Sequence, residues 1–298
     1  MTAQSSSERL PAGTHIGRTA LRVADLDATV SFYRDVVGLA VRSRDADEAV
    51  LGTDGEPLLV LLRADEFPER GRTDAGLFHT AFRVPSRVAL GEALGRVRGR
   101  WRLDGASDHG VSEALYLSDP EGNGVEIYRD RPREEWSIDD DGTVTMVTEP
   151  LDLDAVAGAA GAAGTAERGD SSAPADRAPP DTDIGHVHLE VTSLSAFESV
   201  YVDGLGFEVG MTGPDVRFVA AGGYHHHLAA NTWRGRTTPA TGRGIAWFEV
   251  VVSDRAAVKA VRDRLDALGP AADIEVTERA NGLEVRDSDG IRVRVRAE

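Results

Sequence analysis

The stretch His109-Gly-Val-Ser-Glu-Ala-Leu-Tyr-Leu-Ser-Asp-Pro-Glu-Gly-Asn-Gly-Val-Glu126 carries the pattern that decides the fold. An apolar strand runs into a turn rich in Asp, Gly and Asn, and a second apolar strand leaves the turn with Glu126 between two apolar residues. An interior carboxylate costs several kcal/mol unless it is paired or bound to a metal. Histidine is the side chain that most often joins a carboxylate at a metal. The stretch therefore predicts a buried site around this glutamate.

The elements before this stretch complete a repeating unit. A strand at Gly76–Val84 and a helix at Ser86–Arg98 precede it, so the unit reads strand, helix and three strands. The same order occurs four times. The four repeats cover about 13–66, 75–132, 183–234 and 242–298.

Residues 133–182 separate the second repeat from the third. They are acidic at first and then rich in Ala, Gly and Pro. A short surface helix is the alternative for the Ala-rich part, but the Gly spacing and the closing prolines favour a mobile tether. The sequence thus predicts an N-terminal domain at 13–132, a linker at 133–182 and a C-terminal domain at 183–298.

The composition limits the chemistry. The chain has no cysteine, so a metal must take nitrogen and oxygen ligands. Its 50 acidic and 33 basic residues give a formal charge of −17, which repels nucleic acid and anionic lipid. No apolar run is long enough for a membrane helix, and the first residues do not resemble a signal peptide. We expect a cytoplasmic protein, and the acidic excess favours a halophilic, salt-rich cell.

The fourfold repeat resembles the vicinal oxygen chelate superfamily, which includes glyoxalases, bleomycin-resistance proteins and extradiol dioxygenases. This resemblance implies an α+β fold of four βαβββ repeats that form two open, curled sheet barrels. Within the superfamily, the opening stretch is similar to the signature of extradiol ring-cleavage enzymes of the catechol 2,3-dioxygenase type. The matching positions are His109, Tyr116, Asp119, Gly122 and Glu126.

The resemblance also implies a metal site. Such enzymes bind Fe(II) through two histidines and a glutamate. The glutamate corresponds to Glu126, and one histidine corresponds to His79 on the first strand of the same repeat. In the fourth repeat, Ile245 and Arg292 are expected at the positions of His79 and Glu126. Neither can bind a cation, so the C-terminal half cannot form a triad alone.

The second histidine should lie fifteen residues before the tyrosine of the following helix. Counting back from Tyr33 gives Arg18, which cannot bind a cation, and counting back from Tyr201 gives His186. We therefore expect the metal between repeats two and three, while repeats one and four pair without metal. A flexible linker of this length reaches roughly 30 Å, which permits this pairing.

Two further histidines are candidates for the site, one as a ligand and one as the acid and base. His15 is the alternative ligand, in a register shifted by three residues that reverses the faces of the strand. His226 corresponds to the acid and base beside bound O2 in the related enzymes, and strand alternation points it inward. By the same resemblance, His109 and Tyr116 hydrogen-bond the metal-bound substrate oxygen.

The expected function is extradiol cleavage of a catechol by O2 to a muconic semialdehyde-type product, with Fe(II), or alternatively Mn(II), as the metal. A glyoxalase-type lyase or isomerase on the same scaffold is one alternative, although it would usually show two glutamates. A metal-free binding protein is another, although the eight histidines gather on the predicted site strands. The partners are a small aromatic substrate and O2, without nucleic acid or membrane, in a possible homo-oligomer.

Overall fold

The computed structural model describes residues 9–140, 142–167 and 176–298. The chain divides into two compact units: unit 1 comprises Met1–Leu21, Glu66–Phe78 and Gly185–Glu298, and unit 2 comprises Arg22–Asp65 and His79–Ile184. Among the described helices, none combines the length and apolar character needed to cross a membrane.

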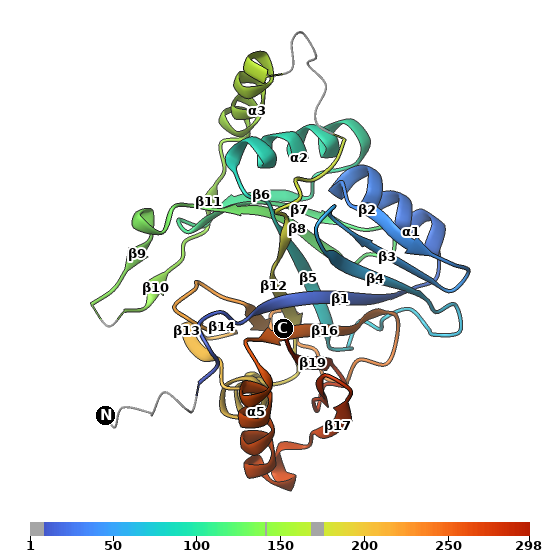
Figure 1. The fold of residues 1–298 in the computed structure, drawn as a ribbon, viewed down its shortest axis with the longest axis vertical. Coiled ribbons are helices and arrows are strands. Elements are labelled where there is room, and N and C mark those ends of the chain that lie inside the picture. Colours follow the sequence, from blue (N-terminus) through green and yellow to red (C-terminus); the bar gives the residue numbers. More distant parts are fainter. Residues whose placement is uncertain (1–8, 141, 168–175) are drawn as a thin grey trace. The chain divides into compact units, whose positions relative to one another are not determined.

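Unit 2 contains the helices and most strands of the first two repeats (Figure 1). The strands pair in the orders β4-β3-β2 and β11-β6-β7-β8-β5, and only β5 and β8 run parallel. Its elements are α1 (Leu26–Phe32), η1 (Tyr33–Val37), β2 (Ala40–Arg44), β3 (Glu48–Gly52), β4 (Pro57–Arg63), β5 (Gly76–Arg83), α2 (Arg87–Arg100), β6 (Gly105–Asp108), β7 (Ser112–Ser118), β8 (Gly124–Asp130), η2 (Arg133–Glu135), β9 (Ser137–Ile138), β10 (Val144–Thr145), β11 (Glu149–Pro150) and α3 (Leu153–Glu167).

Unit 1 contains the third and fourth repeats together with most of β1. Its strands pair in the orders β17-β18-β19-β16-β1 and β12-β15-β14-β13. Its elements are β1 (His15–Val23), β12 (Asp183–Glu190), α4 (Leu194–Phe197), η3 (Glu198–Gly204), β13 (Glu208–Gly213), β14 (Val216–Ala220), β15 (Leu228–Asn231), β16 (Gly244–Val252), α5 (Arg255–Leu268), η4 (Pro270–Ala272), β17 (Glu275–Arg279), β18 (Gly282–Arg286) and β19 (Arg292–Ala297).

The division into units differs from the division into sequence halves. The boundaries fall inside β1, β5 and β12, and within unit 1 the first strand of repeat one lies beside β16 of repeat four. The four repeats have the expected strand, helix and three-strand order. This confirms an α+β fold of βαβββ repeats with open sheets.

The two sequence halves repeat each other at a constant spacing of 168 residues. Tyr33 donates a hydrogen bond to Asp119 at 3.2 Å, and Tyr201, 168 residues later, donates to Asp287 at 2.9 Å. Both carboxyls are buried, and burial raises the pKa of Asp119 to about 6 and that of Asp287 to about 7. Each pair joins the helical segment of one repeat to the turn before the last strand of the next.

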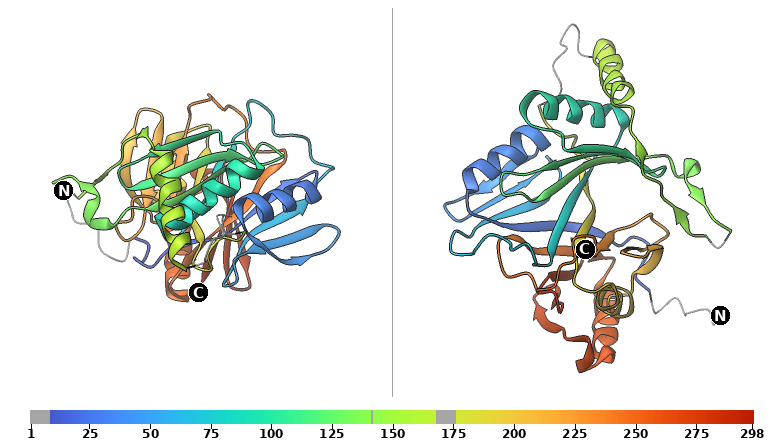
Figure 2. Two further views of the ribbon diagram at one scale, coloured as in Figure 1. Left: turned by 90° about the horizontal axis from the view of Figure 1, so that it is seen from above. Right: turned by 180° about the vertical axis from the view of Figure 1, so that it is seen from behind.

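The segment after the second repeat corrects one expectation. A mobile tether is wrong for Leu153–Glu167, which form helix α3 packed against α2 (Figure 2). The helices approach closely because α2 offers a glycine: a Cβ on Gly91 would lie 2.4 Å from the carbonyl oxygen of Val156. Val156 is fully buried. Residues 133–152 of the predicted linker contain η2, β9, β10 and β11, whereas residues 168–175 lie outside the described residues.

Candidate metal centre

Unit 2 brings together His79 and Glu126. They lie on the neighbouring parallel strands β5 and β8, and Nε2 of the histidine is 2.9 Å from a carboxylate oxygen of the glutamate. Both residues are buried, with 6% and 2% of their surface exposed. Tyr116 on β7 is directly opposite Glu126, and its ring centroid is 5.8 Å from that of His79. One face of the sheet formed by β5, β8 and β7 thus carries an imidazole, a carboxylate and a phenol.

A chain of hydrogen bonds runs outward from Tyr116. Its hydroxyl is 2.7 Å from Nε2 of His109, and Nδ1 of this histidine is 2.6 Å from the carbonyl oxygen of Val147. A carbonyl only accepts, so Nδ1 of His109 carries a proton, and Nε2 is the atom that meets the tyrosine hydroxyl. Burial, and next the Glu126 carboxylate, raise the pKa of Tyr116 above its ordinary value, which keeps the phenol protonated.

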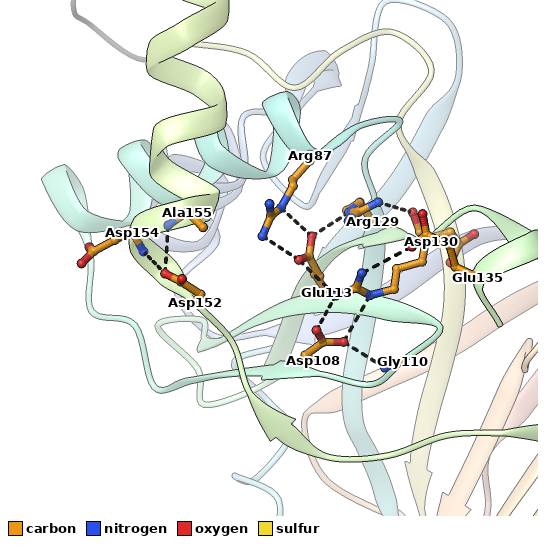
Figure 3. Close-up of polar contacts among 11 residues, drawn as sticks. Arg87, Asp108, Gly110, Glu113, Arg129, Asp130, Glu135, Asp152, Asp154 and Ala155 are labelled. Atoms are coloured by element: carbon orange, nitrogen blue, oxygen red, sulfur yellow. Dashed lines mark hydrogen bonds and ion pairs between the residues drawn. The ribbon is translucent and has the colours of Figure 1, made fainter. Parts of the chain in front are cut away.

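An ion cluster around the buried carboxylate of Glu113 anchors the strands that carry Tyr116 and His109 (Figure 3). Glu113 on β7 is 1% exposed and contacts Arg87 at 2.9 Å and Arg129 at 2.7 Å. Arg131 joins the cluster, lying 3.5 Å from the same carboxylate and forming an ion pair with Asp108. Asp108 ends β6, directly before the histidine of the hydrogen-bonded chain. The cluster therefore fixes the strand pair that presents both the histidine and the phenol.

Unit 1 brings together His186 and His226. His186 lies on β12 and His226 in the loop before β15, with their ring centroids 4.2 Å apart and both residues buried. Nδ1 of His226 is 2.7 Å from Nδ1 of His225. His227 takes another direction and accepts a hydrogen bond from the backbone N–H of Ala221 at 3.2 Å. The loop therefore does not follow strict alternation, because two of its three histidines lie side by side.

The two remaining histidines have local partners. Nε2 of His188 is 3.0 Å from the side-chain nitrogen of Asn231, and its ring lies 4.8 Å from that of Phe78, the residue before His79. His15 is exposed at the start of β1, where Nδ1 is 3.1 Å from the carbonyl oxygen of Gly13. The exposed position of His15 favours His186 as the ligand.

The fourth repeat corrects the assignment of Ile245 and Arg292. The strand register pairs Ala81 with Glu126 in the second repeat and Glu249 with Arg294 in the fourth. Glu126 therefore corresponds to Arg294, and His79, two residues before Ala81, corresponds to Trp247. Both assignments were two residues off, although neither alternative supplies a metal ligand.

The corresponding side chains of repeats one and four meet within unit 1. The guanidinium carbon of Arg294 lies 3.9 Å from the ring centroid of Trp247, and that of Arg18 lies 5.6 Å from it. Arg18 precedes His186 by the same 168 residues that separate His79 from Trp247. All three positions that correspond to the expected ligands thus come together in repeats one and four.

His79 and Glu126 of unit 2 and His186 of unit 1 are of residue types that bind divalent transition metals. Two imidazoles and one carboxylate supply neutral nitrogen and anionic oxygen, and all three residues are buried. Sequence reasoning missed the Val147 carbonyl, which lies in the segment expected to begin the tether. It also missed Trp247 and Arg294, although the constant spacing of 168 residues would have identified them.

The chain is similar to known dioxygenases and glyoxalases. A family model described as the Glyoxalase/Bleomycin resistance protein/Dioxygenase superfamily matches residues 15–127. A catechol-2,3-dioxygenase of Bacillus subtilis (strain 168) is 38% identical over 283 residues, which cover 92% of this chain and 94% of the relative. A biphenyl-2,3-diol 1,2-dioxygenase 3 of Rhodococcus globerulus is 33% identical over 114 residues, or 37% of this chain and 60% of that protein.

Solved structures have a similar fold. A putative dioxygenase from Bacillus subtilis subsp. subtilis str. 168 superposes with a TM-score of 0.62 at 14% identity, over 95% of this chain and 84% of the other. Glyoxalase I from Zea mays superposes with a TM-score of 0.58 at 15% identity, over 96% and 92% of the two chains. At these identities the likeness concerns the fold alone.

Proposed function

The chain belongs to the glyoxalase/bleomycin resistance protein/dioxygenase superfamily and is an extradiol ring-cleavage dioxygenase, and from that premise we propose that His79, Glu126 and His186 hold its catalytic metal. The substrate class is a catechol. The reaction breaks the ring bond next to the diol and places both atoms of O2 in a muconic semialdehyde-type product.

The observation that carries the ligand assignment is the internal duplication. In repeats one and four, Arg18, Trp247 and Arg294 converge within a single unit. The residues at the matching positions of repeats three and two are His186, His79 and Glu126. Duplicated folds place matching strands in matching geometry. The convergence seen in repeats one and four therefore supports a triad of His186, His79 and Glu126.

Fe(II) is the proposed metal, and Mn(II) is the alternative. When bound, such a metal supplies a Lewis acid for the two catechol oxygens and a redox partner for O2. His79 and His186 would hold it through imidazole nitrogen, and Glu126 through its carboxylate.

His226 is the proposed acid and base. Its Nδ1 is bonded to His225, so Nε2 is the atom that would take the proton of a catechol hydroxyl and later return it. Its place beside His186, at 4.2 Å between ring centroids, supports this role.

Tyr116 and His109 are the proposed hydrogen-bonding pair for substrate oxygen. The phenol stays protonated and lies beside Glu126. Nε2 of His109, 2.7 Å from the phenol oxygen, orients this hydroxyl toward the substrate. The Val147 carbonyl holds the imidazole in this orientation.

A cytoplasmic location in a salt-rich cell completes the proposal. The salt-rich cell rests on the formal charge of −17, because a dense negative surface is tolerated where salt screens it. Raising KCl from low to multimolar concentration should increase the free energy of unfolding, and equal stability at both concentrations would count against a halophilic origin.

The experiment that tests the function is anaerobic reconstitution with Fe(II), followed by addition of catechol and O2. We expect a yellow ring-opened product and one O2 consumed per catechol, followed with an oxygen electrode. A parallel sample with Mn(II) identifies the preferred metal. No oxygen uptake by fully metallated protein would exclude the ring-cleavage activity on catechol.

A further inference from the structure

A cluster of charged side chains covers one sheet face of unit 1. This face carries Trp247 and Arg294, which correspond to His79 and Glu126. The members of the cluster, called the arginine cluster below, lie on β1, β16, β17, β18 and β19 and are linked by ion pairs, and two of them, Arg18 and Arg294, also lie over the ring of Trp247. They are Arg18, Glu249, Arg279, Glu284, Arg292, Arg294 and Arg296.

Glu284 is the first of two buried carboxylates in the cluster. It accepts hydrogen bonds from Arg279 at 2.7 Å, from Arg292 at 3.0 Å and from Arg294 at 2.8 Å. Burial raises its pKa, but these three guanidiniums lower it further, to about 2. This carboxylate is therefore ionised at neutral pH, and it is shared by three positive charges.

Glu249 is the second buried carboxylate. Arg18 binds both of its oxygens, at 2.7 and 3.2 Å, and Arg296 contacts it at 3.4 Å. The side chain of Glu249 is 3% exposed, and that of Arg18 is 36% exposed. The glutamate is thus fully engaged within the cluster.

The cluster has more positive than negative charge. Five guanidiniums surround two carboxylates, which leaves an excess of three positive charges in a chain whose formal charge is −17. Like charges held this close repel one another unless a counter-ion is present. The local excess is therefore opposite in sign to the whole chain.

Several donors of the cluster face solvent. Among the described residues, Glu284 is the one acceptor of Arg279 and of Arg292, whose side chains are 48% and 40% exposed. Arg294 is 29% exposed, donates to Glu284 through Nε and lies over the indole of Trp247. The remaining N–H groups are available to a ligand.

We propose that the arginine cluster binds a small oxyanion, either a carboxylate or a phosphate. The planar guanidinium offers paired donors that match these groups. Matching positions of the duplicated fold would then serve opposite ligands. Histidine and glutamate would bind a cation in repeats two and three, and arginine around tryptophan would bind an anion in repeats one and four.

The test compares sodium phosphate and sodium succinate with sodium chloride, at low-millimolar concentration and matched ionic strength, on the full chain. We expect a saturable change in tryptophan fluorescence that is absent in Trp247→Phe, and a rise in Tm with an oxyanion but not with chloride. A response to phosphate alone identifies a phosphate ligand, and a response to succinate alone identifies a carboxylate.

The variant Arg292→Gln should weaken the response about tenfold or more, because it removes a charged donor. The matched control is Arg262→Gln, an arginine of α5 in the same unit that pairs with Asp266 and lies outside the cluster. This control should keep the full response. No response beyond chloride, or equal losses in the two variants, would overturn the proposal and leave a purely structural ion cluster.

Discussion

The second and fourth repeats have the same backbone register and opposite chemistry at one pair of positions. His79 and Glu126 form a buried imidazole–carboxylate pair in the second repeat, and Trp247 and Arg294 form a stacked cation–aromatic pair in the fourth. The scaffold therefore determines where side chains meet, and the residues placed there determine whether a metal can bind. Four predictions test this contrast.

The largest effect is expected at Glu126. In Glu126→Ala the site loses its anionic ligand, so metal content and ring-cleavage activity should fall to background. Arg294→Ala is the matched control, since it alters the corresponding position of the other pair and should keep both. The measurements are metal content by mass spectrometry and oxygen uptake. Full activity of Glu126→Ala would remove this residue from the site.

A smaller effect is expected at Tyr116. Tyr116→Phe removes the phenol that lies between Glu126 and His109, and loss of one hydrogen-bond donor at a reacting oxygen lowers kcat by about 10²-fold. Metal content should be unchanged, because the phenol is not a ligand. An unchanged kcat in a fully metallated variant would show that Tyr116 only packs in the core.

Glu284 of the fourth repeat corresponds to Tyr116 of the second. Its substitution should affect the stability of the fold. Glu284→Ala leaves three guanidiniums without their shared carboxylate, which costs about 2 kcal/mol once the solvent exposure of the arginines is allowed for. Urea unfolding measures this loss, and Tyr116→Phe should change stability less. Equal stability of Glu284→Ala and the parent would mean that solvent already neutralises the cluster.

The smallest effect concerns pH. The folded pKa of Asp287, about 7, lies above the ordinary value, so the folded state holds the proton longer than the unfolded state. Its contribution to stability is complete below about pH 4 and is lost as the pH rises toward 7. Asp287→Asn should flatten this decline by about 1 kcal/mol or more between pH 5 and 8. Urea unfolding across this range checks it, and an identical slope in parent and variant would contradict it.

Local patterns predicted much of the fold and site. The turn after β7 and the alternation around Glu126 are properties of consecutive residues, so they could be recognised from sequence. The same holds for His79, which lies on an apolar strand of the same repeat.

Other features depend on contacts between distant segments. The Ala- and Gly-rich composition of α3 resembles a tether, and only the close approach of Val156 to Gly91 makes it a packed helix. The Val147 carbonyl reaches His109 from a segment with no motif of its own. Trp247, by contrast, lies 168 residues after His79, so the sequence alone could have selected it over Ile245, and the strand pairing agrees.

The central claim is that the second histidine ligand comes from the third repeat. The most direct measurement is the iron content of His186→Ala and His15→Ala after anaerobic reconstitution, with the parent chain beside them. The account predicts that His186→Ala loses its iron while His15→Ala keeps the parent level. Full iron content in His186→Ala together with loss in His15→Ala would contradict it and place the site within the N-terminal half.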